Sequence, residues 1–562
     1  MSFKKCFARK LRGNDYLIHL WTDKEGYQKI EWTNQAYSEC SEADASHSGL
    51  NGEPLRKVRN WDREDPKLHF HDMTPYQKFL VEKYGVNDEP STTQREIFFD
   101  IEIEMGGALT EEYIKSAPKK VTSIAWYDKQ VDLWGILILD AKDNLKHTKT
   151  KNREIIPCRT EDELLMKFVE KFREMDPDII VGWNSDYFDI PYLYYRICNV
   201  LGQDIARYLS PIGYVRETPW YKDQFIQIAG VESLDYMRLH KKFSWADEPS
   251  FKLDAIGEKY AGLNKIEYDG NLDDLFEEDP LKFIQYNFRD VEILKVLDEK
   301  LEYLSLVKNL AHKGKHNYSE VYANTKTQDG AISAYLLSKG IVPPAKERNP
   351  LSKKNYAGGY LFCPKAGIYN YMFDEDLTSL YPSIIMTINI GKETMVGRII
   401  DADDRNNRLG LNDLQQRNPD EELIVENAKR RRTKVPISKL VKMVIDNELS
   451  ISANGVLFRT DNESVLSTIL KKWFDERVLY KNKMKEAYQA GDKELGASFH
   501  MKQYTMKILL NSLYGATALG SFRYGNVILS EAITLSGQRI IQESALTANR
   551  HMNKVIRKEI EL

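Results

Sequence analysis

The chain has 562 residues, a formal net charge of −4 and a mean hydropathy of −0.52, an ordinary globular composition in a chain too long for one hydrophobic core. No apolar run is long enough to span a bilayer, and the first residues lack the apolar core of a signal peptide. The five cysteines form no Cys-x-x-Cys pair, which predicts free thiols in a reducing cytoplasm and excludes a disulfide framework.

The pattern of apolar and polar residues changes along the chain. Residues 1–94 mix short strand-like runs, such as 16–21, with polar turns. Between 95 and about 303, apolar strands alternate with helical periods, which predicts an α/β unit. A helical connector and a Pro- and Lys-rich linker follow. The polar stretch 401–434 is expected to be a surface insertion, and helical periodicity is strong from about 464 to 515.

The stretch 95–104, "REIFFDIEIE", alternates apolar and acidic residues as a strand does. Asp100 and Glu102 are two apart, so they project from one face of the strand, roughly 7 Å apart. Carboxylate oxygens on one face suit a hard cation such as magnesium. By itself, the pattern also fits a half-buried strand with a solvated acidic face.

The stretch 176–193, "DPDIIVGWNSDYFDIPYL", predicts a buried strand, a turn at 182–184 and a helix that begins near Pro191. Asp189 lies at the mouth of this strand–helix unit, where ligands usually bind. A helix N-cap is its alternative role.

The stretch 281–301, "LKFIQYNFRDVEILKVLDEKL", predicts an amphipathic helix. Tyr286 and Asp290 are four residues apart, so a phenol and a carboxylate share one face. Taken singly, such a pair is most often a surface feature.

The stretch 373–385, "FDEDLTSLYPSII", continues a strand-like run from Tyr369 and then turns into a helix near Pro382. Asp376 therefore lies at a strand end, beside backbone amides and Tyr381. This carboxylate is placed to hold a metal against a phosphate, a chemistry that normally needs a second carboxylate.

Two later helices carry basic and aromatic side chains. In 471–485, Arg477 and Lys481 share a face. In 501–515, Lys507, Asn511 and Tyr514 follow one another along a face. These groups suit a triphosphate and a base pair, and a solvated amphipathic surface is the alternative for each helix.

Three motifs in order, DIE, NSDYFD and YNFRD, resemble the DEDDy 3′–5′ exonucleases. The resemblance implies that four carboxylates bind two magnesium ions, with manganese as an alternative: Asp100, Glu102, Asp189 and Asp290. It also implies that Tyr286 orients the attacking water.

Further motifs resemble family B DNA polymerases, nearest to the replicative enzymes of T-even-type tailed phages. They are DLTSLYPSII as palm motif A, KILLNSLYG as finger motif B, YAGGY at 356–360 and FKLDAIGEKY at 251–260. The implied fold is a multidomain α/β chain with the following parts: a mixed α/β N-terminal domain over 1–94 to which 304–344 returns, a ribonuclease H-like exonuclease over 95–303, an incomplete antiparallel palm over 345–463, helical fingers over 464–519, and a second palm part over 520–562 that stops before motif C.

The resemblance also implies roles around Asp376. Asp376 and the Leu377 carbonyl would bind two magnesium ions with the missing carboxylate, and Tyr381 would pack under the sugar. The remaining implied contacts are the amides of Ser379, Leu380 and Tyr381 to the triphosphate, the cations Arg477, Lys481 and Lys507 with Asn511 beside them, and Tyr514 with Gly515 along the nascent base pair.

The second palm carboxylate is missing. The family carries it in an Asp-Thr-Asp motif after motif B, and these 562 residues contain no Asp-Thr-Asp. The nearby Asp374 and Glu375 are misplaced on the same strand, and the aspartates of 401–404 have no strand context. We therefore expect a second polypeptide with motif C and the thumb to complete a heterodimer. A split gene and a truncated chain both fit this pattern.

The favoured hypothesis is the large chain of a split, replicative phage DNA polymerase with a complete proofreading exonuclease. Its expected partners are primer–template DNA, a single-stranded 3′ end, dNTPs, the second chain and, through that chain, a sliding clamp. No membrane is expected, and the location would be the host cytoplasm. A stand-alone 3′–5′ exonuclease and a non-catalytic DNA-binding scaffold are the alternatives.

Overall fold

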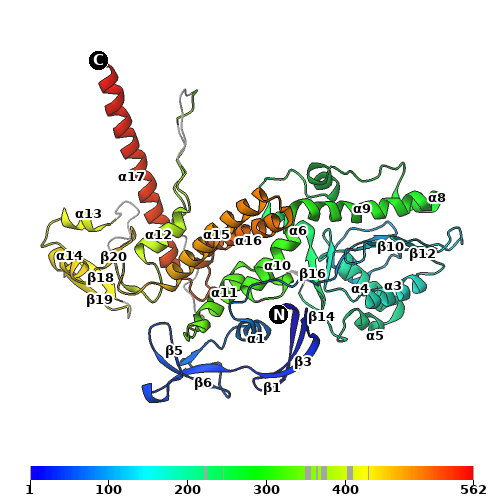
Figure 1. Cartoon of the computed structure of the whole chain (residues 1–562), viewed down its shortest axis with the longest axis horizontal. Helices are drawn as coiled ribbons and strands as arrows, with labels where there is room; N and C mark the ends of the chain where they lie inside the picture. The colour runs from blue at the N-terminus through cyan, green and yellow to red at the C-terminus, as the bar shows by residue number, and fades with distance from the viewer. Residues whose placement is uncertain are drawn as a thin grey trace. The chain divides into compact units, whose positions relative to one another are not determined.

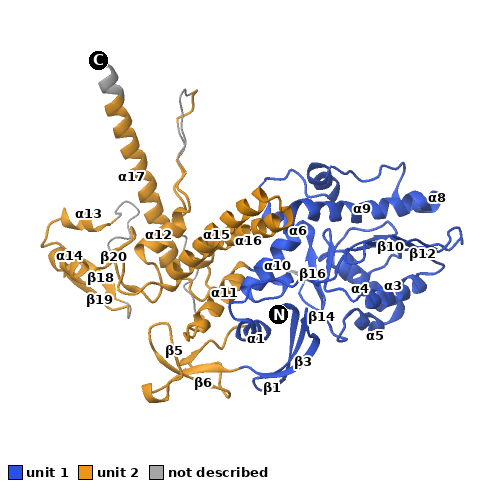
Figure 2. Cartoon of the chain, in the orientation of Figure 1, with its two compact units in different colours: residues 1–34, 74–323 blue, residues 35–73, 324–562 orange. Residues whose placement is uncertain are grey.

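The structure is a computed structural model (Figure 1), which describes residues 2–219, 225–244, 246–347, 356–362, 365–368, 376–400, 409–427 and 430–560. Two compact units make up the chain, one of residues 1–34 and 74–323 and the other of 35–73 and 324–562 (Figure 2). Both units mix strands and helices, which confirms the expected multidomain α/β fold class. The finer domain boundaries expected from the sequence stay a prediction.

Unit 1 begins with a small antiparallel sheet in the order β1-β2-β3, and its strands are β1 (Phe3–Arg12), β2 (Asp15–Thr22) and β3 (Gly26–Thr33). The expected strand at 16–21 lies within β2. Helix α1 (Pro75–Tyr84) packs against this sheet through Phe79 and Leu80.

A seven-stranded sheet forms the centre of unit 1, in the order β11-β12-β10-β9-β8-β13-β16. Its strands are β8 (Glu96–Ile103), β9 (Val121–Asp128), β10 (Leu133–Leu139), β11 (Thr148–Lys149), β12 (Arg153–Cys158), β13 (Ile179–Gly182) and β16 (Glu232–Asp235). Strand β8 pairs antiparallel with β9 and parallel with β13, so the chain direction within the sheet changes beside β8.

Helices cover both faces of this sheet. The helices of unit 1 after α1 are α2 (Glu111–Ser116), α3 (Glu161–Met175), α4 (Asp189–Leu201), α5 (Gln203–Ala206), α6 (Tyr236–Phe243), α7 (Leu253–Ile256), α8 (Leu272–Glu278), α9 (Pro280–Leu301) and α10 (Tyr303–Gly314). A two-stranded ribbon adds β14 (Val215–Glu217) and β15 (Ile226–Ile228). Figure 1 shows α9 and the α3–α4 pair on opposite sides of the sheet.

The alternation of β8 decides which residues face which layer. Ile97, Phe99 and Ile101 belong to the buried cluster that includes residues of α3 and α4. Asp100 and Glu102 therefore project from the other face, which α9 covers. Helix α9 starts where the sequence predicts, because Pro280 suits its first position and the Asp279 side chain accepts a hydrogen bond from the Lys282 amide.

Unit 2 contains two antiparallel sheets, in the orders β5-β6-β4-β7 and β19-β18-β17-β21-β20. The strands are β4 (Ala36–Glu39), β5 (His47–Ser48), β6 (Pro54–Val58), β7 (Leu68–His69), β17 (Met395–Ile399), β18 (Glu422–Asn427), β19 (Arg432–Pro436), β20 (Ser450–Ile451) and β21 (Val456–Phe458). Residues 35–73 join this unit partly through Ser48, whose backbone bonds with Gly340 and Val342 after helix α11 (Asn324–Ser338).

The described part of 401–434 is more than the expected surface insertion. It contains α13 (Leu411–Gln415), β18 and the start of β19, and Leu409, Leu414 and Leu423 are buried with residues of α14 (Ile437–Asp446). The reason is that these leucines are spread among charged residues, so the stretch is polar on average while one face is apolar. Residues 401–408 lie outside the described residues.

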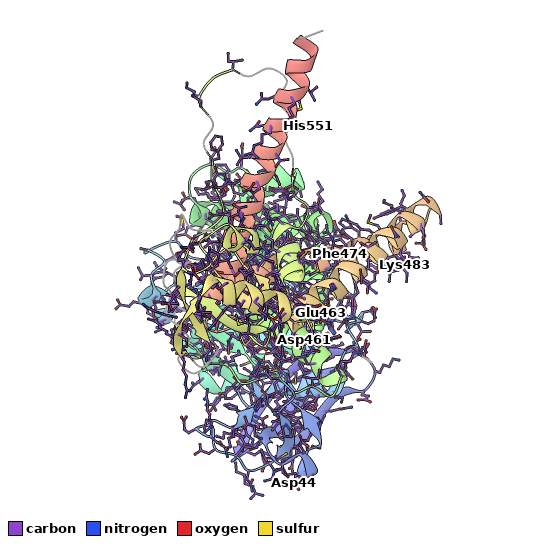
Figure 3. The ribbon with its side chains drawn as sticks, turned by 90° about the vertical axis from the view of Figure 1, so that its left-hand side faces the viewer. Asp44, Asp461, Glu463, Phe474, Lys483 and His551 are labelled. Carbon is purple, nitrogen blue, oxygen red and sulfur yellow. The ribbon has the colours of Figure 1, made fainter. Side chains whose placement is uncertain are left out.

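The other helices described in unit 2 are the short α12 (Leu380–Ile388) and the long α15 (Val465–Gln489), α16 (Lys493–Thr517) and α17 (Val527–Ile560). The helices expected at 471–485 and 501–515 lie inside α15 and α16, which pack together as a hairpin. Figure 3 shows α15, marked by Phe474 and Lys483, diverging from α17, marked by His551. No helix in the described ranges has both the length and the apolar character that a membrane crossing requires.

Candidate active site

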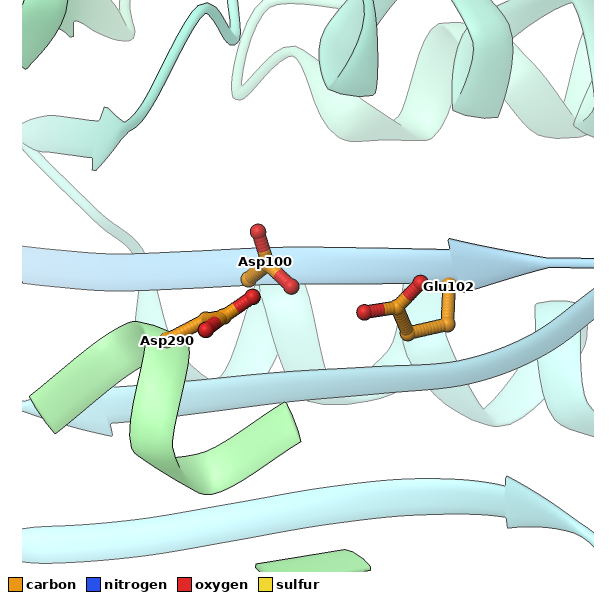
Figure 4. A group of neighbouring side chains, drawn as sticks. All are labelled: Asp100, Glu102 and Asp290. Carbon is orange, nitrogen blue, oxygen red and sulfur yellow. The ribbon is translucent and has the colours of Figure 1, made fainter. Parts of the chain in front are cut away.

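Three of the expected carboxylates meet in unit 1. Asp100 and Glu102 project from β8 towards Asp290 on α9, and each contributes an oxygen to a group whose members lie within 4.8 Å of one another (Figure 4). Asp290 is buried, whereas Asp100 and Glu102 are half-buried. The strand period of two in β8 and the position of Asp290 on α9 thus create a compact acidic cluster.

Asp189, the fourth expected carboxylate, lies outside this group of three but close enough to repel it. It is buried as the first residue of α4 and accepts a hydrogen bond from the Ile101 amide of β8, at 3.2 Å from Oδ1. Its negative charge raises the pKa of both Asp100 and Glu102. The N-cap position itself belongs to Phe188.

Tyr286 lies one turn before Asp290 on α9, as the helical spacing predicts, and both contact Lys265. The Lys265 ammonium donates to Asp290 Oδ2 at 2.5 Å and to the Tyr286 hydroxyl at 3.1 Å. Lys265 was not singled out from the sequence, because its segment after α7 has no regular period that would place it.

Asn287 is a second residue that the sequence analysis missed. Its side-chain amide is fully buried, donates to Asp100 Oδ2 at 2.7 Å and accepts from the Ser123 hydroxyl at 2.8 Å. The available signal was an amide in the middle of a predicted amphipathic helix, next to Tyr286. Asn287 fixes the orientation of the Asp100 carboxylate.

The four carboxylates hold protons unusually tightly. Burial, followed by repulsion from Asp290, raises the pKa of Glu102 to about 8. Burial raises the pKa of Asp189 to about 7, against the effect of the Ile101 amide. The pKa of Asp100 is raised well above its usual range by burial and then by Asp290, and burial also raises the pKa of Asp290. Burial alone would lower the pKa of Lys265, but Asp290 raises it.

These residues fit divalent metal ions. Hard cations prefer carboxylate oxygens, and a cation would relieve the repulsion that raises these pKa values. Asp290 Oδ1 is buried and has no hydrogen-bond partner among the described residues, although its companion oxygen is paired with Lys265. A buried carboxylate oxygen with an open coordination position is what a metal ligand requires.

In unit 2, Asp376 is exposed immediately before α12, and Leu377 is 41% exposed. The expected strand leading to Asp376, with Asp374 and Glu375, lies outside the described residues. Ser379 adopts φ +55° as the N-cap of α12, so the chain turns sharply after Asp376. Among the residues described, no group of three metal-ligating side chains includes Asp376.

Two of the expected aromatic residues meet in unit 2. The rings of Tyr381 on α12 and Tyr514 on α16 lie 4.3 Å apart, centre to centre. Burial and then Tyr356 raise the pKa of Tyr514, and burial and Tyr356 also raise the pKa of Tyr381. The YAGGY segment thus joins the same aromatic cluster.

The expected cations lie on the α15–α16 hairpin. Lys481 and Asn511 are exposed, Lys507 is half-buried, and burial lowers the pKa of Arg477. The Arg477 Nε is buried without a hydrogen-bond partner in the described part of the chain, so it has an unused donor. Helix α12 contacts both α15 and α16, which brings the Asp376 turn into the neighbourhood of this hairpin.

Two family models match the chain. "DNA polymerase family B, exonuclease domain" matches residues 79–256, and "DNA polymerase family B" matches residues 323–561. The first match contains Asp100, Glu102 and Asp189, and the second contains Asp376, Tyr381 and Tyr514.

Two similar proteins carry the name DNA-directed DNA polymerase. The Escherichia phage RB69 protein is 26% identical over 96% of this chain and 66% of its own length. The Enterobacteria phage T4 protein is 27% identical over 71% of this chain and 47% of its own length. The chain therefore spans about half to two thirds of these relatives. The structure of the family B DNA polymerase from Pyrobaculum calidifontis is similar to this one. The match covers 98% of this chain and 72% of the Pyrobaculum chain, with TM-score 0.66 and 17% sequence identity.

Proposed function

The chain belongs to DNA polymerase family B, and on this premise we propose that it removes nucleotides from DNA 3′ ends at the Asp100 site and contributes part of a DNA-synthesis site around Asp376. The observation that carries the exonuclease part is the group formed by Asp100, Glu102 and Asp290. One buried oxygen of Asp290 has no hydrogen-bond partner among the residues that the structure describes.

In the proposed exonuclease, Asp100, Glu102, Asp189 and Asp290 would hold two magnesium ions, for which manganese could substitute. Such a pair supplies a water activated for attack and charge stabilisation at the leaving oxygen. Asn287 keeps the Asp100 carboxylate oriented.

The roles of Tyr286 and Lys265 follow from their contact. Lys265 donates to the Tyr286 oxygen, so the phenol keeps its own O–H as a donor toward the attacking water or a phosphate oxygen. Burial, with repulsion from Asp290, raises the pKa of Tyr286, which therefore stays protonated.

The exonuclease test uses a 5′-labelled single strand with magnesium. Asp290→Asn should lower the rate by more than about 100-fold, beyond the usual effect of losing a residue that only supports a metal ligand. Glu292→Gln, which removes a carboxylate from the same helix at a partly exposed position, should leave the rate unchanged. Equal rates for Asp290→Asn and wild type would refute the assignment.

For DNA synthesis, we propose that Asp376 and the Leu377 carbonyl hold metal ions and that Tyr381 packs beneath the nucleotide sugar. The further contacts would be the amides of Ser379, Leu380 and Tyr381 to the triphosphate, the side chains of Arg477, Lys481, Lys507 and Asn511 around its phosphates, and Tyr514 against the base pair. Two observations support this set: the Tyr381–Tyr514 contact, and the buried Arg477 Nε, which has no hydrogen-bond partner within the described ranges.

The synthesis site needs a second carboxylate. Since these 562 residues contain no Asp-Thr-Asp, we propose that a segment outside them, for which the sequence predicts a second polypeptide, supplies it together with the thumb and the docking site for a sliding clamp. The substrates would be primer–template DNA and dNTPs, in the cytoplasm of a phage-infected host. An exonuclease acting alone is the second candidate, because three of its four carboxylates form a metal-ligating group, while no such group of three includes Asp376 among the described residues.

A primer-extension experiment separates these two candidates. The chain is incubated with a labelled primer–template, magnesium and all four dNTPs, with and without a polypeptide that carries the Asp-Thr-Asp hairpin and thumb. Extension only with the added polypeptide would support the proposal that a segment outside these 562 residues completes the synthesis site. Extension by this chain alone would refute it, and shortening under both conditions would favour the exonuclease alone.

A further inference from the structure

Strand β19 is an edge strand of the five-stranded sheet in unit 2, because among the described strands it pairs with β18 alone. Figure 1 shows it next to β18 and α14. An edge strand presents a row of backbone N–H and C=O groups that can pair with another extended chain.

The register of β19 shows which backbone groups belong to this row. The Ile437 amide, directly after β19, donates to the Glu421 carbonyl at 2.8 Å, and the pairing with β18 continues without a register shift. Bonded and non-bonded positions alternate in an antiparallel pair, so the N–H and C=O groups of Arg432 and Lys434 point away from β18. Pro436, the next outward position, has no N–H and ends the row of donors.

Cations surround this outward row. The Lys434 side chain is exposed, and its ammonium has no ion-pair or hydrogen-bond partner in the part of the chain that the structure describes. The exposed Arg432 donates from Nε to Glu426 Oε2 at 3.0 Å, so its two terminal nitrogens keep further donors. The other exposed cations beside the row are Arg430, Arg431, Lys439 and Lys442. We call the outward row and these six cations the β19 edge.

The alternation of β19 decides what kind of chain would fit along it. Val435 packs against the buried cluster that contains Leu423, so Arg432 and Lys434 project from the opposite face of the sheet. An added strand would alternate in the same way, with every second side chain on the face of Arg432 and Lys434. Acidic residues at alternate positions therefore match the β19 edge.

The charge of the β19 edge also excludes two other occupants. A second copy of β19 would place like charges opposite one another, which destabilises a strand pair. A nucleic-acid backbone would satisfy the cations, but its phosphates carry no donor for the outward C=O groups of Arg432 and Lys434. An acidic polypeptide offers both carboxylates and backbone donors.

We propose that the β19 edge binds an extended segment of another polypeptide with acidic residues at alternate positions, which adds a sixth strand to this sheet. Backbone hydrogen bonds to Arg432 and Lys434 set the register of the added strand, and its carboxylates face the cations. This interaction goes beyond the proposed exonuclease and synthesis sites and depends on neither of them.

The test measures binding of a fluorescent peptide of alternating Glu and Thr to the full chain by anisotropy. Arg432→Glu/Lys434→Glu should weaken binding by at least about tenfold, because two attractive pairs become repulsive. Lys434→Glu alone, which keeps the Arg432–Glu426 pair, should weaken it by about threefold. The matched control, Lys485→Glu/Lys493→Glu, makes the same change of charge at exposed positions where α15 and α16 meet, and should leave binding within about twofold.

A peptide with N-methylated backbone amides keeps its carboxylates but cannot add a strand. It should bind at least about tenfold more weakly than the parent peptide, since its backbone donors are lost. Equal binding of the two peptides would overturn the proposal, as would unchanged binding by Arg432→Glu/Lys434→Glu.

Hydrogen exchange gives a readout that does not depend on a variant. The outward amides of Arg432 and Lys434 should exchange more slowly when the parent peptide is bound and at their original rate with the N-methylated peptide. A duplex DNA that protects these two amides more than the parent peptide does would overturn the proposal and assign the β19 edge to nucleic acid.

Discussion

When no cation is bound, repulsion among the carboxylates of the cluster lowers the stability of the folded chain. Asp100, Glu102, Asp189 and Asp290 all have raised pKa values, so each binds protons more tightly in the folded than in the unfolded chain. For such groups, stability is highest below the unfolded pKa and falls as pH rises through the folded pKa. The metal-free protein should therefore be least stable in mildly alkaline solution, and metal ions should reverse the loss.

Glu102→Gln tests whether charge repulsion destabilises the metal-free protein. The variant should unfold at a higher temperature than wild type at pH 8.5 in EDTA, with a gain on the order of 1 kcal/mol, because it removes one of the repelling charges. At pH 4.5 the gain should disappear, since Glu102 is protonated in the folded wild type. Thermal unfolding followed by circular dichroism measures the difference in stability between the variant and wild type at each pH. A gain that is the same at the two pH values would show that charge repulsion is not its cause.

Asn287 offers a test of carboxylate orientation. Asn287→Leu keeps the volume of the side chain but removes the donor to Asp100 Oδ2. Exonuclease rate and manganese affinity should each fall by about 10- to 100-fold, the usual effect of losing a partner that orients a metal ligand. Ser123→Ala removes only the group behind Asn287 and should have a smaller effect. Manganese binding followed by electron paramagnetic resonance gives a readout independent of turnover.

At the scale of elements, the sequence predicted what local periodicity determines. Asp100 and Glu102 share a face because β8 has a period of two, and Tyr286 and Asp290 share one because α9 is helical. That these faces meet was available only through the resemblance, since it depends on how α9 crosses the sheet. Lys265 could not be predicted, because it reaches the site from an irregular segment.

The elements of unit 2 were predicted unevenly for a related reason. Helices α15 and α16 are long and periodic, so their existence was clear from the sequence. Strands β18 and β19 could not be recognised from the sequence, because they contain charged residues such as Glu422, Glu426 and Arg432. Within β18, Leu423 is buried in the hydrophobic core. Average polarity therefore concealed a strand whose core-facing residues are apolar.

Close packing between α12 and α17 leaves little room for a side chain at Gly537. A Cβ at Gly537 would lie 3.1 Å from the Tyr381 ring and 3.3 Å from Ile384 Cδ1. Gly537→Val should therefore destabilise unit 2 by about 1–3 kcal/mol and displace Tyr381 from Tyr514. Urea denaturation measures the change.

Gly515→Ala is the matched control, because Gly515 also lies in a helix and a Cβ there meets no atom within 4 Å. It should be neutral or stabilise the chain by up to about 1 kcal/mol through helix propensity. Equal stabilities for Gly537→Val and wild type would mean that α12 and α17 separate at little cost.

At the scale of the whole molecule, both units are built from segments distant in sequence, and Arg523 ties the segments of unit 2 together. Its guanidinium is fully buried and donates to Asp329 at 2.8 Å and to Asp72 at 2.6 Å. It also donates to the Pro344 carbonyl. One side chain thus joins the 35–73 segment, helix α11 and the turn between α16 and α17.

Arg523→Met should destabilise unit 2 by about 3–5 kcal/mol, because Asp72 loses its cation and the buried Asp329 keeps only Lys346, at 3.3 Å. Arg417→Met, which breaks a partly exposed ion pair with Glu421, should cost less than about 1 kcal/mol. Urea denaturation of the two variants gives the comparison. A loss for Arg523→Met no larger than that for Arg417→Met would show that the three segments are held by other contacts.

The link between Asp72 and Arg523 also constrains the order of folding during synthesis on the ribosome. The two residues are 451 positions apart, so a ribosome adding 5–20 residues per second needs about 20 to 90 s between them. During that interval the 35–73 segment is already outside the ribosome without its permanent neighbour. Strands β4 to β7 must therefore wait for nearly the whole chain, while residues 74–323 of unit 1 are complete long before. A nascent chain halted before residue 523 should thus expose the 35–73 segment to proteases and chaperones.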